Sequence, residues 1–360
     1  MSAVDFKREL QSFLQQEKTQ ECKATVMPDF FLDRFVTLDW DVTKFSECLA
    51  DVAKRKGGSI DGISQIDMRG GNAVNVASAL TGLDAKVTPI VCTSEYGLHQ
   101  IKYRSKKDKL DASHIKTTCK ASITTALEFQ AQNGKTNVML RDLGGLADFG
   151  PANLNDNDWA LIEASDYVCV FNWAGTVKHG TALAKAVFER AHNGRAKTYY
   201  DTADPNPNAK GIADLLTKVL KTDLVDILSL NENEAITYAS LMDESLKEKK
   251  ERLSFAELAM VAARVLAQHL SARIDLHATS FSASLKGKSE IIMPTFKVKV
   301  LRATGAGDAW NAGNILGDKY GLKVECRLML ANAVSACYLS DPKGLHPTKA
   351  KLAKFLKDNS

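Results

Sequence analysis

A glycine-rich segment at residues 301–313 constrains this chain of 360 residues more than any other part of it. Gly305 and Gly307 precede a run that can form a helix, and because glycine has no Cβ, its backbone can approach a ligand closely. The free N–H groups and positive dipole end of a helix that starts here would favour an anion, most simply a phosphate. Asp308 falls in the first turn of that helix, where a carboxylate can take a proton from a hydroxyl that attacks phosphorus. Aspartate is also favoured there as a helix cap alone, so the residues by themselves support both interpretations.

A second glycine pair, Gly70-Gly71, follows a strand-like stretch at residues 60–69. The pattern predicts a helix with Asn72 at its cap and Asn75 one turn later. By itself, this segment indicates only a well-capped helix.

These two segments, in this order, resemble the N-terminal and C-terminal signatures of the ribokinase-like (PfkB-type) sugar and nucleoside kinases. The resemblance implies that the Gly-Ala-Gly-Asp segment forms an anion hole and carries the catalytic base. It also implies that an aspartate after the first strand (residues 23–27) holds acceptor hydroxyls, since a carboxylate can accept two hydrogen bonds. From the residues alone, that aspartate would be a surface residue in a turn. The predicted catalytic residues are Gly305, Ala306, Gly307 and Asp308, and the predicted acceptor-binding residues are Asp33, Gly70, Gly71, Asn72 and Asn75.

The residues that bind the nucleotide and its metal ion are predicted from the same resemblance. Asn231 and Glu234 follow a predicted strand, and their spacing brings both side chains to one face of a helix start. In the family, this Asn-x-x-Glu motif helps to hold Mg²⁺ and phosphates, mainly through water, which suits a cation that keeps several waters. Helix capping is the structural alternative. The predicted nucleotide-binding residues are Asn231, Glu234, Thr304, His277 and Asn332, and the first two are also the predicted metal residues.

The strand predicted at residues 274–278 departs from the family pattern, because no glycine follows it until Gly287. Arg273, His277 and Thr279 are similar instead to the related ADP-dependent sugar kinases. A buried, hydrogen-bonded histidine is the alternative explanation for His277. The other two motifs resemble the ATP-dependent branch more closely, so we predict ATP as the better donor, with ADP left open.

A second departure precedes the anion hole, where Arg302 and Ala303 replace the aspartate and threonine that are common in the family. That aspartate often belongs to a monovalent-cation site, so potassium activation is not predicted. Arg302 could itself add positive charge near the phosphates.

Alternating strands and helices predict an α/β fold: a three-layer αβα, ribokinase-like core with a mostly parallel sheet, plus a small β lid. The predicted parts are a helical extension at residues 1–20, a core at 21–30, 70–114 and 142–360, and a lid at 31–69 and 115–141. The extension would pack on the body or on a second subunit. Within the lid we expect strands at 115–118, 122–130 and 136–141, with a hairpin turn at Asn133-Gly134 between the last two. Arg141 and Asp142 lie where the chain returns to the core, and either would touch substrate or form a surface ion pair.

The composition and the sequence motifs argue against several other classes of protein. With 47 basic and 43 acidic residues, the formal charge of +4 is too small to indicate nucleic-acid binding. Seven cysteines without a C-x-x-C motif indicate reduced thiols in the cytoplasm rather than a zinc site. No apolar run is long enough for a membrane span, and the N-terminus is not typical of a signal peptide. A dinucleotide fingerprint fails because Trp310 stands in place of its third glycine.

The sequence therefore predicts a cytoplasmic, Mg²⁺-dependent kinase that phosphorylates a hydroxyl of a sugar, sugar phosphate or nucleoside. Its partners would be the acceptor and the nucleotide, and a homodimer stays open. Two alternatives stay open as well: an ADP-dependent sugar kinase of the same fold, and a non-catalytic ligand-binding protein on a kinase scaffold.

Overall fold

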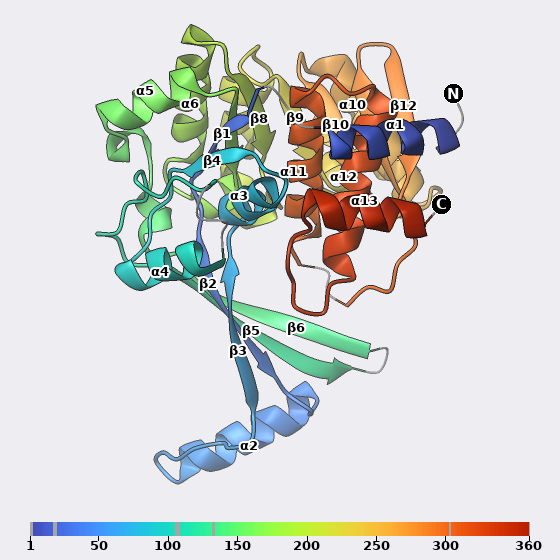
Figure 1. The fold of residues 1–360 in the computed structure, drawn as a ribbon. Helices are drawn as coiled ribbons and strands as arrows, with labels where there is room; N and C mark the ends of the chain where they lie inside the picture. The colour runs from blue at the N-terminus through green and yellow to red at the C-terminus, as the bar shows by residue number, and fades with distance from the viewer. Residues whose placement is uncertain (1–2, 17–19, 105–108, 132–133, 302–303, 360) are drawn as a thin grey trace.

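The computed structural model describes residues 3–16, 20–104, 109–131, 134–301 and 304–359. An eight-stranded sheet forms the body, and a four-stranded sheet projects from it (Figure 1). Six strands of the main sheet are parallel, and the last two form an antiparallel hairpin at one edge. Their order is β12 (Ser289–Pro294), β11 (Phe281–Lys286), β10 (Arg273–His277), β9 (Ile227–Leu230), β8 (Lys197–Asp201), β7 (Tyr167–Phe171), β1 (Lys23–Met27) and β4 (Lys86–Pro89).

The main sheet is buried on both faces, as the strand β7 illustrates. Val168 and Val170 join one hydrophobic core, whereas Tyr167, Cys169 and Phe171 join the other, because side chains alternate along a strand. The first core packs under α5 (Asp156–Ala164), α6 (Gly180–Asn193), α7 (Ile212–Leu215), α8 (Glu232–Ala239) and α10 (Phe255–His269). The second packs under α1 (Ala3–Gln15), α3 (Asn72–Gly82), α4 (Glu95–Arg104), α11 (Ala306–Lys319), α12 (Val324–Leu339) and α13 (Lys349–Asp358). The predicted three-layer α/β fold with a mostly parallel sheet is confirmed.

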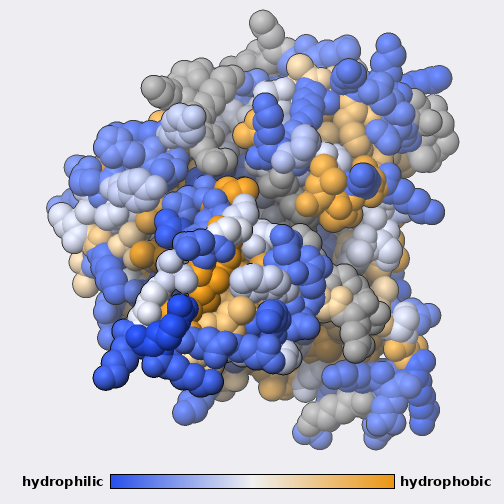
Figure 2. All heavy atoms as spheres, turned by 90° about the horizontal axis from the view of Figure 1, so that it is seen from below, coloured by the Kyte–Doolittle hydropathy of each residue, from blue (hydrophilic) through white to orange (hydrophobic). Residues whose placement is uncertain are grey.

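The second sheet is the small β-sheet that we call the lid, and its strand order is β3 (Ser64–Gly70), β2 (Phe31–Thr37), β5 (Ser122–Ala131) and β6 (Gly134–Asp142). β5 and β6 pair as the predicted antiparallel hairpin, while β2 and β5 run parallel. The helix α2 (Val42–Lys54) lies at the far end of the lid, where Phe45 packs on Phe129 with ring centroids 5.6 Å apart (Figure 1). Seen from below, the molecular surface is mostly hydrophilic, with smaller hydrophobic patches between the polar side chains (Figure 2).

The predicted lid strand at residues 115–118 is wrong. Lys116 forms only an isolated bridge, with Cys92, so this segment lies beside the main sheet and not in the lid. It is held there by side chains, because His114 and Lys116 both contact the buried carboxylate of Asp158 at the start of α5. The β11–β12 hairpin, which turns at Gly287 with a φ of +58°, was not predicted from the sequence.

The N-terminal helix α1 packs on the body of its own chain. Leu10 is fully buried, and the rings of Phe13 and Tyr320 meet edge to face at 5.5 Å. Figure 1 shows α1 beside α13, so the two ends of the chain lie close together. Among the described residues, no helix combines the length and the apolar character needed to cross a bilayer.

Candidate active site where the lid meets the core

Asp308 lies in the first turn of α11, and its side chain is 6% exposed. Two amides from α3 donate to its carboxylate: Asn72 Nδ2 to Oδ1 at 3.0 Å and Asn75 Nδ2 to Oδ2 at 2.9 Å. Burial raises the pKa of Asp308 to about 8, and the charges of Asp201 and Asp29 add to the rise, whereas the two amides oppose it. The structure therefore brings the two predicted signature segments into direct contact.

The start of α11 requires glycine at residue 305. Gly305 is the N-cap in the left-handed region, with a φ of +86°, and a Cβ there would come within 2.7 Å of the Tyr338 hydroxyl. Along with Ala306 and Gly307, Gly305 lines a large cavity. The first N–H groups of a helix have no intrahelical acceptor, so this end of α11 offers donors and a positive dipole end to an anion.

Asp29, which was not among the residues predicted from the sequence, organises the other signature segment. Its buried carboxylate accepts from the backbone N–H groups of Asn72 and Ala73, both at 2.8 Å, and from Asn172 Nδ2 at 2.9 Å. The prediction of Asn72 as the helix cap was wrong: the N-cap is Gly71, and Asp29 supplies the oxygen atoms that a cap would supply. A charged residue between the apolar residues that end β1 and begin β2 was the available signal.

The predicted acceptor residues Asp33 and Gly70 are diagonal neighbours on β2 and β3, where Gly70 is paired with Phe31 and Asp33 with Met68. A Cβ on Gly70 would overlap the carboxylate of Asp33, at 1.9 Å from Oδ2, so this glycine makes room for the aspartate. Burial raises the pKa of Asp33 to about 6, although a hydrogen bond with Thr124 opposes the rise. Asp33 lies at a smaller cavity, along with Gly71, Asn72 and Asn75.

Two cavities meet at Asp308. The smaller, of about 310 Å³, lies between the lid and the core. The larger, of about 830 Å³, extends over the ends of β8, β9 and β10. Asn72, Gly305 and Asp308 line both cavities, so one carboxylate and one helix start lie at their junction. Such an arrangement holds two ligands with their reacting groups on either side of a possible base.

The predicted nucleotide-side residues line the larger cavity, except for Thr304, which lines the smaller. Asn231 and Glu234 form a capping box at the start of α8, and Glu234 Oε1 also accepts from Asn231 Nδ2 at 2.7 Å. The capping alternative is therefore present in the geometry, and any ligand role is additional to it. The amide of Asn332 is likewise engaged, with Trp310 Nε1 and the carbonyl oxygen of Pro294.

His277 presents an unpartnered nitrogen at the larger cavity. Its ring lies against Trp310 at 5.2 Å, and no described group hydrogen-bonds Nε2, which lies 4.0 Å from Asp201 Oδ2. Burial lowers the pKa of His277, and Asp201 opposes the fall. Arg302, which the sequence suggested as a second positive group, lies outside the described residues.

Among the described residues, no lysine or arginine pairs with the carboxylates Asp201, Glu234 and Asp308. Burial raises the pKa of Glu234 well above its ordinary value, and the charges of Asp201, Asp204 and Asp308 raise it further. No cluster of three or more potential metal ligands is found in the described part of the chain. The carboxylate oxygens of Asp201, Glu234 and Asp308 could face the water molecules of a divalent cation such as Mg²⁺, which keeps several of its waters.

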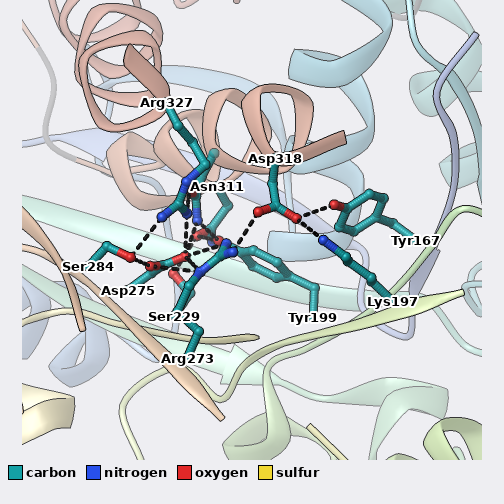
Figure 3. Close-up of polar contacts among 11 residues, drawn as sticks. Tyr167, Lys197, Tyr199, Ser229, Arg273, Asp275, Ser284, Asn311, Asp318 and Arg327 are labelled. Atoms are coloured by element: carbon teal, nitrogen blue, oxygen red, sulfur yellow. Dashed lines mark hydrogen bonds and ion pairs between the residues drawn. The ribbon is translucent and has the colours of Figure 1, made fainter. Parts of the chain in front are cut away.

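A buried polar network below the cavities includes Asn311, Tyr199 and Ser229 (Figure 3), and Asn311 also holds Asp201 in place. Asn311 Nδ2, from α11, donates to Asp201 Oδ2 at 2.7 Å, while Asn311 Oδ1 accepts from Tyr199 and Ser229. Deeper in the core, Arg327 and Arg273 both pair with Asp275. The network links the strand ends to α11, so α11 carries both Asp308 and the residue that orients Asp201.

The model of the pfkB family of carbohydrate kinases matches residues 41–350. The chain belongs to this family. It is therefore a phosphotransferase with a hydroxyl group as acceptor, and the alternative of a non-catalytic binding protein is not supported.

Solved structures show the same fold. A ribokinase of Arabidopsis thaliana, complexed with ribose and ATP, is 16% identical, with 94% of this chain and 99% of that chain covered and a TM-score of 0.69. An adenosine kinase of Sinorhizobium meliloti is 15% identical, with 95% and 100% covered and a TM-score of 0.68. A ribokinase of Cryptococcus neoformans in complex with ADP is 14% identical, with 94% and 99% covered and a TM-score of 0.68. No curated protein matches the chain at a significant level.

Proposed function

We propose that this kinase transfers the γ-phosphoryl group of ATP to a hydroxyl of a sugar, sugar phosphate or nucleoside. The observation that carries the proposal is the position of Asp308, buried at the junction of a smaller and a larger cavity. The acceptor would occupy the smaller cavity, where Asp33 and the amides of α3 bind its hydroxyls. The nucleotide would occupy the larger one.

Asp308 would remove the proton from the attacking hydroxyl. Its raised pKa, about 8, suits this role, because a base whose pKa lies near the working pH keeps a usable ionised fraction and holds the abstracted proton well. The N–H groups at Gly305–Gly307 would stabilise the charge on the transferred phosphoryl group, which is the larger part of catalysis in phosphoryl transfer.

Mg²⁺ would be held by Asn231 and Glu234, mainly through water, and when bound it would neutralise charge on the phosphates. The carboxylates that pair with no described lysine or arginine support this assignment, because a cation would relieve the repulsion that raises the pKa of Glu234. The protein's own contribution is to fix those carboxylates, through the capping box at Asn231 and through Asn311 beneath Asp201.

ATP is our proposed donor, because the two signature segments resemble the ATP-dependent branch and meet at Asp308. ADP is the second candidate, and the free Nε2 of His277 at the larger cavity favours it. Location in the cytoplasm, the homodimer and the domain boundaries stay predictions.

The test is a screen of sugars, sugar phosphates and nucleosides with Mg²⁺ and either ATP or ADP, using preparations free of adenylate kinase. Phosphorylated product should form from at least one acceptor and be identified by mass spectrometry. If nucleotide is consumed at the same rate with and without every acceptor, the proposal of transfer to these classes is refuted.

A further inference from the structure

The lid contributes one cation, Arg141, to the smaller cavity. We propose that Arg141 binds an oxyanion group of the acceptor, a phosphate monoester or a carboxylate, so that the acceptor is an anionic sugar rather than a neutral sugar or nucleoside. This inference rests on the proposed function in one respect, namely that the acceptor occupies the smaller cavity.

Strand pairing places Arg141 in the wall of that cavity. Asp33 of β2 and Arg141 of β6 are both paired with Thr124 of β5, so the three side chains form one row on one face of the lid. All three line the cavity. The next row on this face, Phe35, Ala126 and Met139, is apolar and also lines it. The lid thus offers a carboxylate, a hydroxyl and a guanidinium in line, beside an apolar strip on which the C–H face of a sugar ring can pack.

The ring of Phe31 orients the guanidinium of Arg141, and no described carboxylate forms an ion pair with it. Its Cζ lies 5.1 Å from the centroid of the Phe31 ring. An arginine that stacks on an aromatic ring keeps its N–H donors in the guanidinium plane, where they can bind an oxyanion in bidentate fashion. Within the described structure Arg141 forms no ion pair, and the neighbouring Asp142 is paired with Lys120 at 2.6 Å instead. A surface ion pair, the alternative that the sequence left open for Arg141, is therefore not what the structure has.

The charges around the cavity indicate why a cation is useful there. Of the described residues that line the cavity, Arg141 is the one cation, whereas Asp29, Asp33, Asp204 and Asp308 are carboxylates. Asp29 is already occupied by two backbone N–H groups and Asn172. The hydroxyls of a neutral sugar donate to acceptors such as Asp33, and their oxygens can accept from a guanidinium, but such a bond is weaker than one to an oxyanion. An oxyanion, in contrast, would be repelled by this cavity unless a cation met it, and charge-assisted bidentate bonds to arginine are the strong form of that contact.

The test compares matched neutral and anionic acceptors on the wild type, on Arg141→Met and on Lys120→Met. The control, Lys120, is a cation at the same end of the lid that does not line the cavity. The probes are D-ribose with D-ribose 5-phosphate, D-fructose with D-fructose 6-phosphate, and D-glucose with D-gluconate, each with saturating ATP and Mg²⁺. The first two pairs test a phosphate and the third a carboxylate.

We expect wild type to prefer the anionic member of at least one pair by about tenfold or more in kcat/KM. Arg141→Met should raise KM for that acceptor by about ten- to hundredfold, leave the neutral member nearly unchanged and alter kcat little. Lys120→Met should behave as wild type. Preference for the neutral member in every pair, or an anionic preference that survives in Arg141→Met, would overturn the proposal.

A binding measurement distinguishes failure of the role of Arg141 from failure of the proposed phosphoryl transfer. Titration calorimetry of the two sugar phosphates and gluconate, on wild type and Arg141→Met, requires no phosphoryl transfer. If no probe is phosphorylated but wild type binds an anionic sugar that Arg141→Met does not bind, the role of Arg141 stands and the proposed transfer fails. If wild type transfers phosphate to neutral sugars and binds none of the anionic ones, the kinase function stands and the role of Arg141 is refuted.

Discussion

Replacing Asn75 by leucine should move the acid limb of the kcat/KM profile to higher pH. In the structure, Asn75 Nδ2 donates to Asp308 Oδ2 at 2.9 Å, and this bond lowers the pKa of a carboxyl group that burial raises to about 8. A hydrogen bond to a charged group contributes about 1.5–3 kcal/mol, and one pKa unit corresponds to about 1.4 kcal/mol. Its loss should therefore raise the pKa of Asp308 by about one unit or more.

The size of the effect then depends on pH. With a pKa of about 8, about a tenth of Asp308 is ionised at pH 7, and with a pKa of about 9, about a hundredth is. Asn75→Leu should consequently lose about tenfold in kcat/KM at pH 7 and approach wild type at pH 10. Bound Mg²⁺ and nucleotide would shift the pKa in both proteins alike, so the predicted quantity is the difference between them rather than the absolute position of either limb.

The assay is initial-rate kinetics from pH 5.5 to 10 at constant ionic strength, with saturating nucleotide and acceptor below KM. Ser78→Ala is the matched control, because Ser78 lies one turn further along α3 and its hydroxyl contacts His346 rather than Asp308. A loss of the same size at every pH would refute the reasoning, and it would indicate that Asn75 holds the acceptor instead of tuning the base.

Other predictions follow from the same site. Asp308→Asn should reduce turnover at least about a hundredfold while the protein stays folded. Because the pKa of Asp308 is raised on folding from 3.8 to about 8, wild-type stability falls as pH rises through that window, so the melting temperature of the variant should exceed that of wild type increasingly up to about pH 8. Asp33→Ala should weaken acceptor binding in calorimetry more than nucleotide binding, and an unchanged acceptor affinity would remove Asp33 from that role. Asn311→Leu, which leaves Asp201 without its amide donor, should raise the Mg²⁺ concentration needed for half-maximal rate, and an unchanged Mg²⁺ dependence would contradict its positioning role. Wild type should show a higher kcat/KM with ATP than with ADP; the reverse result would give His277 a phosphate-side role.

The parts of the fold that follow from short-range patterns were predictable. Alternating strands and helices indicated the layered core, and Asn133-Gly134 indicated a hairpin, because such turns depend on local sequence. β5 and β6 do pair as a hairpin, although Asn133 itself lies outside the described residues. The prediction of a lid strand at residues 115–118 was wrong because long-range contacts decide where this segment lies. Its β-branched pattern fits a strand in either sheet, and contacts of His114 and Lys116 with the distant Asp158 decide where it lies.

The residues of the candidate site also fall into two groups, those that a local motif predicts and those whose partners are distant in the sequence. Gly305 and Asp308 belong to a local motif, and the structure places them at one helix start. Asp29 belongs to no local motif: it acts on Asn72 and Ala73, 43 and 44 positions away, and on Asn172, 143 positions away. Such partners are brought together only by the packing of β1, α3 and β7, so a single sequence carries a signal for the unusual residue but not for what it contacts.

The contrast between two groups of carboxylates completes the argument for a cation at the site. Beneath the site, the network of Figure 3 pairs Asp275 with Arg273 and Arg327, and the two arginines hold the pKa of this buried carboxyl well below its ordinary value. At the cavities, Glu234 and Asp308 are also deeply buried, and burial raises their pKa values, because no described lysine or arginine pairs with them to oppose the rise. Leaving buried carboxylates unpaired costs folding free energy, and arginine residues elsewhere in the core show that the chain can supply partners. We infer that the missing charge arrives with the ligands: the cation that accompanies the nucleotide would relieve this repulsion, so that nucleotide binding and the ionisation of Asp308 would be coupled.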